Sequence, residues 1–359
     1  MERGQYRRNM AAKRGSGSGN RRRKPKKKPK THGGPPKKEL IERHIEYDKS
    51  AKDAANNRFN LSPLPIGIPQ NVTTPGHFSF DWENNPVSLK TEAFLAEKVV
   101  KRGEFGWLSD ERVAEIGEMV DDLDMTLDQA LSLRSAMLQQ KTVYSHGQLQ
   151  ARGKALYRLY REGASVVDLS KKFDFPPMNV FRVILKEMGW SKSRIKETLR
   201  TPSKFKERER NEFSEAEAAD RVSNVDQSET HERADLFEEI LADWFENQGV
   251  RLRRQPEMVK EQMIEHGRPV NTPDLLFIDH VKINGKSVAW IDAKHFYGAD
   301  VDFQRKKMMK QTARYVESWG QGAVVFRHGF CSNIHIPGTV LLDCGPLDLS
   351  PLENFTVDE

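Results

Sequence analysis

Cysteine is scarce in this sequence of 359 residues, which contains only Cys331 and Cys344. Two thiols cannot form a disulfide framework or a four-cysteine zinc site, so this composition is typical of a reducing compartment. Long apolar runs are also lacking, because no segment approaches the roughly 18 apolar residues of a membrane-spanning helix. The N-terminus lacks the apolar core of a signal peptide. We therefore expect neither a transmembrane nor a secreted protein, and no membrane partner.

Acidic residues are nearly missing from the first 38 positions. This segment contains 15 lysines and arginines and one acid, a net charge of +14, whereas the remaining chain carries 43 basic and 51 acidic residues, a net charge of −8. Like charges repel and the segment has little to fold around, so we expect a disordered basic tail over 1–38. The run Arg21–Lys30 is typical of nuclear localisation, of non-specific nucleic-acid contact, or of both. The alternative is a merely solubilising tail; nuclear localisation is our expectation, with a cytoplasmic share left open.

Proline content and charge divide the remaining chain, whose length is natural for two domains. Five prolines between positions 61 and 89 predict an extended linker, preceded by a short polar helix at 39–60. Apolar residues at helical spacing then predict a helical domain, which a mixed-charge segment separates from an α/β domain. The predicted segments are a Pro-rich linker over 39–88, a helical domain over 89–200, a charged linker over 201–230, the α/β domain over 231–349 and a tail over 350–359.

The segment 165–188 has the pattern of a helix-turn-helix. Ser165 with Asp168 predicts the capped start of a short helix, and the prolines at 176 and 177 predict the start of a second one. On the second helix, Asn179, Arg182 and Lys186 share the face opposite the apolar stripe. In a major groove, Asn and Arg can read base edges and Lys can bind phosphate. A purely structural or protein-docking bundle is the alternative, because any three-helix bundle exposes polar residues.

Two apolar runs, 272–277 and 290–294, carry the strongest chemical signal. Asn284-Gly285 between them predicts a β-hairpin. Because strand side chains alternate, Asp292 and Lys294 point the same way, and the hairpin brings Asp274 alongside Asp292. Two converging carboxylates and a lysine suit Mg²⁺-assisted cleavage of a phosphodiester. The plain alternative is an ordinary hairpin with a surface ion pair.

These residues also carry a resemblance to a known family. Pro273-Asp274 with Asp292-x-Lys294 resembles the signature of PD-(D/E)XK nucleases, and Thr272-Pro273-Asp274 with the run 290–294 more closely resembles the TPD family, whose animal members are the codanin-interacting nucleases. The resemblance implies a restriction-endonuclease-like α/β core with a central mixed sheet after the helical module. It implies that Asp274 and Asp292 ligate Mg²⁺ or Mn²⁺ and that Lys294 orients or activates water. Asp292 is shorter than the glutamate common in the signature.

Two predicted helices supply the remaining candidate residues. On the helix 234–248, Glu238 lies at the edge of the apolar stripe and Glu239 nearly opposite it. The resemblance implies that Glu238 completes the metal site directly or through water; the alternative is a surface glutamate. On the basic helix 304–319, Gln311 and Tyr315 lie at i, i+4, and the resemblance implies that Gln311 touches the scissile strand. The plainer interpretation has Tyr315 in the core and Gln311 at its polar edge.

Together these observations predict a nuclear, Mg²⁺- or Mn²⁺-dependent nuclease that hydrolyses structured or branched DNA in preference to RNA. The competing function is a catalytically weak or inactive adaptor that binds nucleic acid and acts through a protein partner such as codanin. The net negative charge of the chain after position 38 favours the adaptor, because nucleases usually offer phosphate a basic groove. The oligomeric state is left open.

Overall fold

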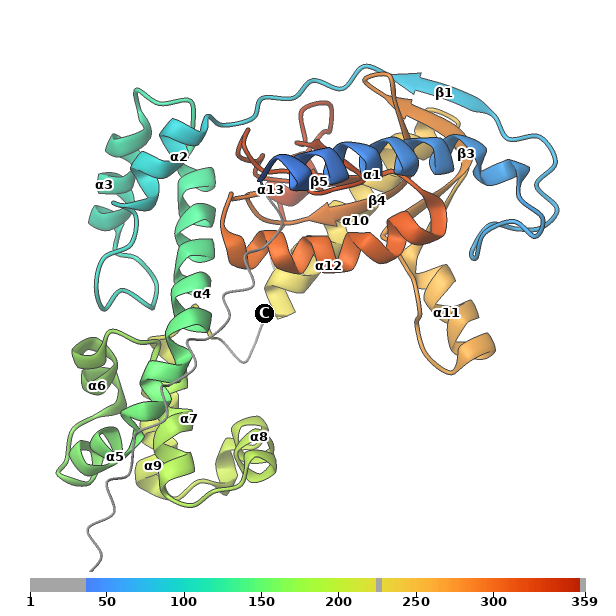
Figure 1. Ribbon diagram of the computed structural model, residues 1–359. Helices are drawn as coiled ribbons and strands as arrows, with labels where there is room; N and C mark the ends of the chain where they lie inside the picture. Colours follow the sequence, from blue (N-terminus) through green and yellow to red (C-terminus); the bar gives the residue numbers. More distant parts are fainter. Residues whose placement is uncertain (1–36, 224–227, 356–359) are drawn as a thin grey trace, which may run out of the picture. The chain divides into compact units, whose positions relative to one another are not determined.

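A tight turn at Asn284–Gly285 sets the register of the central sheet. Both turn residues have a positive φ, 51° and 73°, as the type I′ turn of a two-residue hairpin requires. The turn joins β3 (Leu275–Ile283) to β4 (Lys286–Lys294) in an antiparallel pair. The predicted hairpin is therefore confirmed. The computed structural model describes residues 37–223 and 228–355 (Figure 1).

Four further strands extend the hairpin into a mixed sheet in which β1-β3-β4-β5-β6 are neighbours and β2 also pairs with β3. The pairs β1–β3, β4–β5 and β5–β6 are parallel, whereas β2–β3 is antiparallel. The prediction of an α/β protein with a central mixed sheet is thus confirmed. The added strands are β1 (His77–Phe80), β2 (Leu252–Arg254), β5 (Gly322–Phe326) and β6 (Thr339–Leu342).

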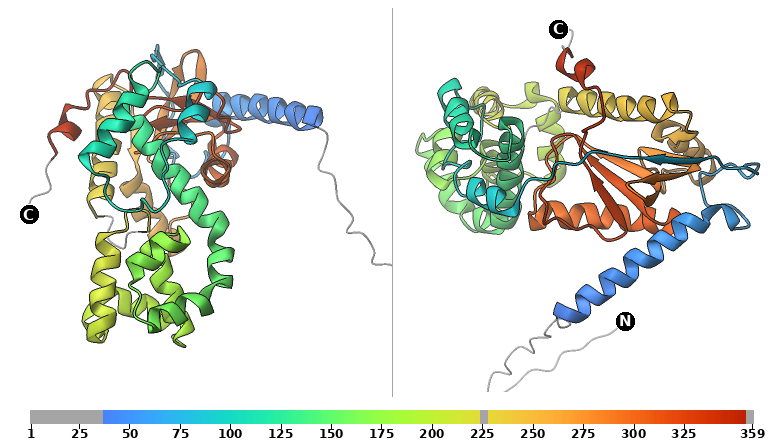
Figure 2. Two further views of the ribbon diagram at one scale, coloured as in Figure 1. Left: turned by 90° about the vertical axis from the view of Figure 1, so that its left-hand side faces the viewer. Right: turned by 90° about the horizontal axis from the view of Figure 1, so that it is seen from above.

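Helices cover both faces of this sheet. Phe237 and Phe245 of α10 (Ser228–Asn247) pack against one face, where they share a core with Ile291. The opposite face packs on α12 (Asp302–Trp319), whose Trp319 shares a core with Trp290. Figure 2, in its right-hand view, shows the strands between α10 and α12. Because strand residues alternate, neighbouring residues of β4 face different helices, and Asp292 lies on the same side as Trp290.

The segment predicted as a Pro-rich linker over 39–88 contributes to this core. Its first part is α1 (Lys37–Asn57), from which Ala51 and Ala55 are buried in the same core as Trp290. Its later part contains β1, followed by the buried Trp82. The prolines do break regular structure, but the apolar residues between them alternate and pair with β3. A run of four residues is too short to stand out as a strand in the sequence.

Helices form over the segment 89–200, which was predicted to be helical. The expected caps at Ser109, Thr126 and Ser165 all accept backbone hydrogen bonds, and Thr126 forms a complete capping box with Gln129. None of the described helices is long and apolar enough to cross a membrane. The helices are α2 (Leu89–Ala96), α3 (Asp110–Val120), α4 (Leu127–Ala151), α5 (Gly153–Arg161), α6 (Val166–Phe173), α7 (Pro177–Glu187), α8 (Lys192–Arg200) and α9 (Glu207–Ala218); α11 (Gln255–His266) and α13 (Ser350–Glu353) follow in the α/β part, and short 3-10 turns span Arg58–Asn60 and Pro202–Lys204.

The segment predicted as a charged linker over 201–230 is more closely packed than its charges indicated. It contains α9, whose Phe213 and Ala216 are buried in the core around α7. Three apolar positions in twelve residues, two of them alanines, gave little periodicity, so the packing of this helix escaped the sequence pattern. Residues 224–227 of the linker, positions 1–36 of the predicted basic tail and the last four residues of the predicted C-terminal tail lie outside the described residues.

Candidate active site

The hairpin itself brings the two aspartates together. Leu275 pairs with Ile291, so Asp274 and Asp292 are the residues one step further along the ladder. Asp274 Oδ2 accepts a hydrogen bond of 2.7 Å from the backbone N–H of Ala293. Asp292 is 0% and Asp274 is 7% exposed, so neither carboxylate can rely on water to stabilise its charge.

Lys294 is the cation closest to this pair of aspartates. Its Nζ lies 2.5 Å from Asp292 Oδ2, as the alternation of side chains predicted. Burial alone lowers the pKa of Lys294, but the charges of Asp292 and Asp274 outweigh it and the net shift is upward. The lysine is therefore a stable ammonium. Burial, followed by repulsion from Asp292 and Glu238, raises the pKa of Asp274 well above its ordinary value.

Glu238 of α10 belongs to the same electrostatic cluster. Burial raises the pKa of Glu238 to about 7, with further upward contributions from Asp235 and Asp292 and a downward one from Lys294. Glu239 next to it is exposed. The structure thus brings Glu238 within interaction range of the other three groups, as the helix periodicity predicted, and places Glu239 away from them.

The α12 helix adds two polar groups above the strand. Gln311 Nε2 donates to Asp292 Oδ1 at 2.9 Å and lies 3.4 Å from the hydroxyl of Tyr315. The Tyr315 hydroxyl in turn donates to the carbonyl of Thr272 at 3.2 Å, and its ring packs on Trp290. Burial, with the charge of Asp292, raises the pKa of Tyr315 to about 12, so this group remains a hydroxyl. Gln311 therefore holds a candidate catalytic carboxylate, while Tyr315 belongs to the core.

Gln255 is a site residue that sequence reasoning missed. Its side-chain Nε2 donates to Asp274 Oδ1 at 2.9 Å, which leaves both oxygens of that carboxylate hydrogen-bonded. Gln255 begins α11 directly after β2, and β2 pairs with the start of β3. A three-residue strand and a single glutamine give no recognisable pattern, so only the pairing of β2 reveals this contact.

The chemistry of the cluster fits a divalent cation. Asp274, Asp292 and the half-buried Glu238 all interact electrostatically with one another and with a single lysine. Full ionisation of the three carboxylates therefore leaves an excess of two negative charges, and carboxylate oxygens are the ligands that Mg²⁺ and Mn²⁺ prefer. Asp292 Oδ2 is buried and receives no well-oriented hydrogen bond, although Lys294 Nζ lies close to it. Within residues 37–223 and 228–355, however, no three His, Cys, Asp or Glu side chains stand ready to hold a metal ion. A bound cation would compete with the Lys294 ammonium for Asp292 Oδ2.

A cleft of about 390 Å³ opens beside this cluster, with Ala293, Lys294 and Gln311 among its lining residues. Its other walls come from one face of α4, the start of α10 and the first turns of α12. Two hydrogen bonds hold α4 there: the backbone N–H of Tyr297 donates to Ser132 Oγ at 2.8 Å, and that of Phe303 donates to Gln140 Oε1 at 3.2 Å. The candidate site is therefore reached from a defined space between α4 and α12.

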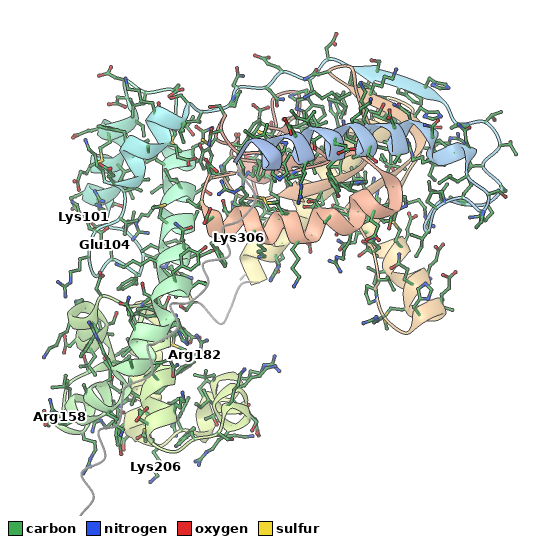
Figure 3. The ribbon with its side chains drawn as sticks, viewed as in Figure 1. Lys101, Glu104, Arg158, Arg182, Lys206 and Lys306 are labelled. Atoms are coloured by element: carbon green, nitrogen blue, oxygen red, sulfur yellow. The ribbon has the colours of Figure 1, made fainter. Side chains whose placement is uncertain are left out.

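Of the three α7 residues predicted to contact nucleic acid, Asn179 and Arg182 are less exposed than expected. The side chain of Asn179 donates to Ser223 Oγ at 2.5 Å. Arg182 of α7, which is labelled in Figure 3, is half-buried; burial lowers its pKa, and the charge of Asp220 opposes this shift. Lys186 is exposed and donates to Gln150 at 2.7 Å. Because the segment after α9 covers part of α7, only one of the three side chains is open to solvent. Their contact with nucleic acid stays a prediction.

Comparison with known proteins finds similarity in the C-terminal part of the chain. Residues 205–344 match the family model described as "Protein of unknown function TPD sequence-motif", and this span contains Glu238, Asp274, Asp292, Lys294 and Gln311. "Uncharacterized protein L539" of Acanthamoeba polyphaga mimivirus is 32% identical over 115 residues, which are 31% of this chain and 40% of the viral protein. The match therefore spans less than half of that relative. No solved structure matches the chain. The resemblance to the TPD family is confirmed for 205–344, and neither description states an activity.

Proposed function

We propose that this protein is a metal-dependent nuclease of the PD-(D/E)XK type that hydrolyses phosphodiester bonds of nucleic acid. The observation that carries the proposal is the burial of Asp274 and Asp292, with the half-buried Glu238, around one ammonium, Lys294, at the wall of a cleft. A structural ion pair needs one carboxylate for one lysine. The surplus of buried negative charge is typical of a site that awaits a cation.

In this proposal, each of the site residues has a separate role. Asp274 and Asp292 would hold Mg²⁺ or Mn²⁺ with Glu238 as a third ligand, directly or through water. The bound cation would polarise a phosphoryl oxygen and favour deprotonation of the attacking water. Lys294, kept charged by its neighbours, donates to the phosphate oxygen on which negative charge grows. Gln311 keeps Asp292 oriented through its hydrogen bond. The water oxygen forms a bond to phosphorus, one ester P–O bond breaks, and the departing oxygen takes up a proton.

The charge of the helical part supports a nucleic-acid substrate. From Arg152 to Lys206 the chain carries 14 lysines and arginines against five acids, a net charge of +9 in a described body that is acidic elsewhere. Lys192, Lys196 and Arg200 of α8 are exposed, so this charge is available to phosphates. We infer that the α6–α7 pair is the helix-turn-helix predicted at 165–188, with α8 adding phosphate contacts beside Lys186. Structured or branched DNA remains the substrate that we propose, in the nucleus.

The decisive experiment pairs cleavage with metal binding. The full chain is incubated with labelled branched and linear DNAs and RNAs in Mg²⁺ or Mn²⁺, and Mn²⁺ affinity is measured alongside. Asp292→Asn should lose both cleavage and Mn²⁺ binding, whereas Glu239→Gln, one position from Glu238 but exposed, should keep both. Absence of metal-dependent cleavage on every substrate would refute the proposal. So would a Glu239→Gln variant as impaired as Asp292→Asn.

One observation favours the second candidate, an inactive adaptor. Asp292 is paired with Lys294 and both oxygens of Asp274 are hydrogen-bonded, so the site is closed without a metal. An adaptor would keep this arrangement as a structural element and act through a protein partner, for which the resemblance suggests codanin. The same experiment separates the two functions, because an adaptor binds nucleic acid or protein without metal-dependent hydrolysis.

A further inference from the structure

The cleft beside the candidate site differs in charge from the protein around it. The chain after position 38 has a net negative charge, yet no Asp or Glu is among the described residues that line the cleft. Lys294 and Lys307 line it, together with the imidazoles of His231 and His295. None of the three carboxylates of the site is among the lining residues. A phosphate that enters the cleft therefore meets cations and hydrogen-bond donors before it meets the acids.

The wall formed by α4 is small and uncharged. Ser132, Ser135, Ala136 and Gln139 line the cleft at positions i, i+3, i+4 and i+7, so one continuous face of the helix is turned toward it. Hydroxyl and amide groups of this kind can donate to or accept from sugar and base edges of any sequence. The wall is fixed, because α4 shares a core with Tyr297 and Ala299 of the loop that follows β4.

The opposite wall offers flat apolar surface. Phe296 and Phe303 both line the cleft and are half-buried, so part of each ring faces the open space. Single strands expose their base faces, and aromatic side chains stack on them without regard to sequence. An intact duplex presents phosphates outward but keeps its base faces stacked inside. Aromatic rings next to a phosphate-binding lysine therefore suit a strand whose bases are unpaired.

The size of the cleft leads to the same substrate. A volume of about 390 Å³ lies at the lower end of the range of about 300–1,000 Å³ found for pockets that enclose small ligands. That space holds one or two nucleotides of a single strand and no base-paired segment. Hydrogen bonds from Tyr297 and Phe303 tie α4 to the far side and oppose a widening of the cleft.

We propose that this cleft takes a single nucleic-acid strand, such as a flap, a loop or a frayed end, and presents it to Lys294, while intact duplex stays outside. This inference rests on the proposed function for the fate of the strand and deepens it by naming the substrate class. Phosphates of the strand contact Lys294 and Lys307, bases stack on Phe296 and Phe303, and the polar face of α4 contacts sugars and base edges.

Binding, measured without any cleavage, tests the occupant of the cleft. The full chain in Ca²⁺ is titrated against a fluorescent single-stranded 12-nucleotide DNA and against the blunt duplex of the same sequence. Ser135→Trp fills the cleft from the exposed side of α4, and Ser79→Trp places the same residue at an exposed position of β1 that does not line the cleft. We expect about tenfold weaker single-strand binding for Ser135→Trp and no change for Ser79→Trp. Phe303→Ala, which cannot block the cleft, should weaken it severalfold.

The result is decisive in either direction. Single-strand affinity that is equal in Ser135→Trp, Phe303→Ala and wild type, in variants that melt at the wild-type temperature, would overturn the proposal. Duplex binding that is as tight and as sensitive to Ser135→Trp would overturn it as well. Cleavage in Mn²⁺ is recorded separately: hydrolysis of intact duplex alone contradicts this inference but keeps the nuclease. Strand binding that depends on the cleft but is not followed by hydrolysis would support the single-strand cleft and refute the proposed nuclease function.

Discussion

Two buried aspartates near each other in sequence have opposite electrostatic surroundings: Asp279 lies within β3, and Asp274 directly precedes this strand. Asp279, 1% exposed, accepts hydrogen bonds from the backbone N–H of Gly76 at 2.7 Å and of Arg251 at 2.8 Å, and its Oδ1 pairs with the Arg251 guanidinium at 2.6 Å. Burial raises its pKa, but the hydrogen bonds from Arg251 outweigh this and the net shift is downward. Asp274 has two neutral donors and two carboxylate neighbours, and its pKa is raised.

The contrast separates a structural carboxylate from a candidate functional one. Asp279 connects Gly76, which precedes β1, and Arg251, which precedes β2, to the strand β3. The hydrogen bonds that its carboxylate accepts from these two residues all favour the ionised form. At Asp274 burial and two neighbouring carboxylates oppose ionisation, whereas Lys294 and the hydrogen bonds from Ala293 and Gln255 favour it. The net shift of its pKa is upward. Repulsion between the carboxylates around Asp274 opposes folding, and clusters of this kind are typical of functional sites. We therefore interpret this cluster as a site that a bound cation would complete.

The largest expected effect is on catalysis. Lys294→Ala removes the ammonium that would stabilise the phosphate in the transition state but removes no metal ligand. We expect cleavage to fall by about 10²–10³-fold, as for loss of one electrostatic stabiliser, while Mn²⁺ binding persists or tightens. Single-turnover cleavage and Mn²⁺ titration of the same preparation measure the two quantities. Lys282→Ala on the exposed strand surface serves as the control.

The second effect is on stability and falls on the structural aspartate. Asp279→Asn leaves donors of Gly76 and Arg251 without their ionic acceptor, so we expect a loss of about 2–3 kcal/mol in the free energy of unfolding. Asp274→Asn also loses an acceptor for Ala293 but removes a repelling charge, so its loss should be clearly smaller. Urea unfolding without divalent metal compares the two variants. Equal losses of unfolding free energy in the two variants would contradict the assignment of Asp279 as structural and of Asp274 as functional.

The pH dependence of stability should sharpen the same comparison. Because the pKa of Asp279 is lower in the folded than in the unfolded protein, its contribution is complete above the unfolded value of about 3.9 and is lost as the pH falls through the folded value. The stability gap between wild type and Asp279→Asn should therefore narrow below about pH 4. Unfolding curves at pH 7, 5, 4 and 3 record it. A gap that widens toward low pH contradicts the assignment.

The smallest expected effect is on the salt dependence of DNA binding, which we compare between lysines of α8 and lysines of the β3–β4 hairpin. Replacing Lys192 and Lys196 of α8 by alanine should weaken DNA binding and lower the slope of log affinity against log salt by about two. The same double change at Lys282 and Lys286, exposed near the hairpin turn, should leave the slope unaltered. Fluorescence anisotropy at several salt concentrations measures both. Equal slopes in all proteins would remove α8 from the nucleic-acid surface.

The sequence predicted the site where its geometry is local. Asp274, Asp292 and Lys294 lie on one hairpin whose turn and alternation can be read directly, and helical periodicity separated Glu238 from Glu239. Contacts between distant segments could not be read in this way. Gln255 reaches Asp274 only because β2 pairs with β3. The packing of α9 beside α7 was not predicted, so the sequence overestimated the exposure of the polar face of α7.

The fold shows the same limit. The mixed sheet followed from apolar strands around Asn284-Gly285, and the capped helices followed from their first turns. The pairing of β1 with β3 did not, because four residues between prolines carry too weak a pattern to identify a strand. The cleft also escaped, since its α4 wall looks like an ordinary polar helix face until Tyr297 and Phe303 are seen to hold it in place.

The central claim is that the cluster around Asp274 is a divalent-cation site, whereas that around Asp279 is complete as it stands. Calorimetric titration with Mn²⁺ of wild type, Asp274→Asn and Asp279→Asn, each shown to be folded at the temperature used, tests it most directly. We expect wild type and Asp279→Asn to bind Mn²⁺ with similar affinity, and Asp274→Asn to bind it at least about tenfold more weakly. No Mn²⁺ binding by wild type, or equal binding by Asp274→Asn, would contradict it.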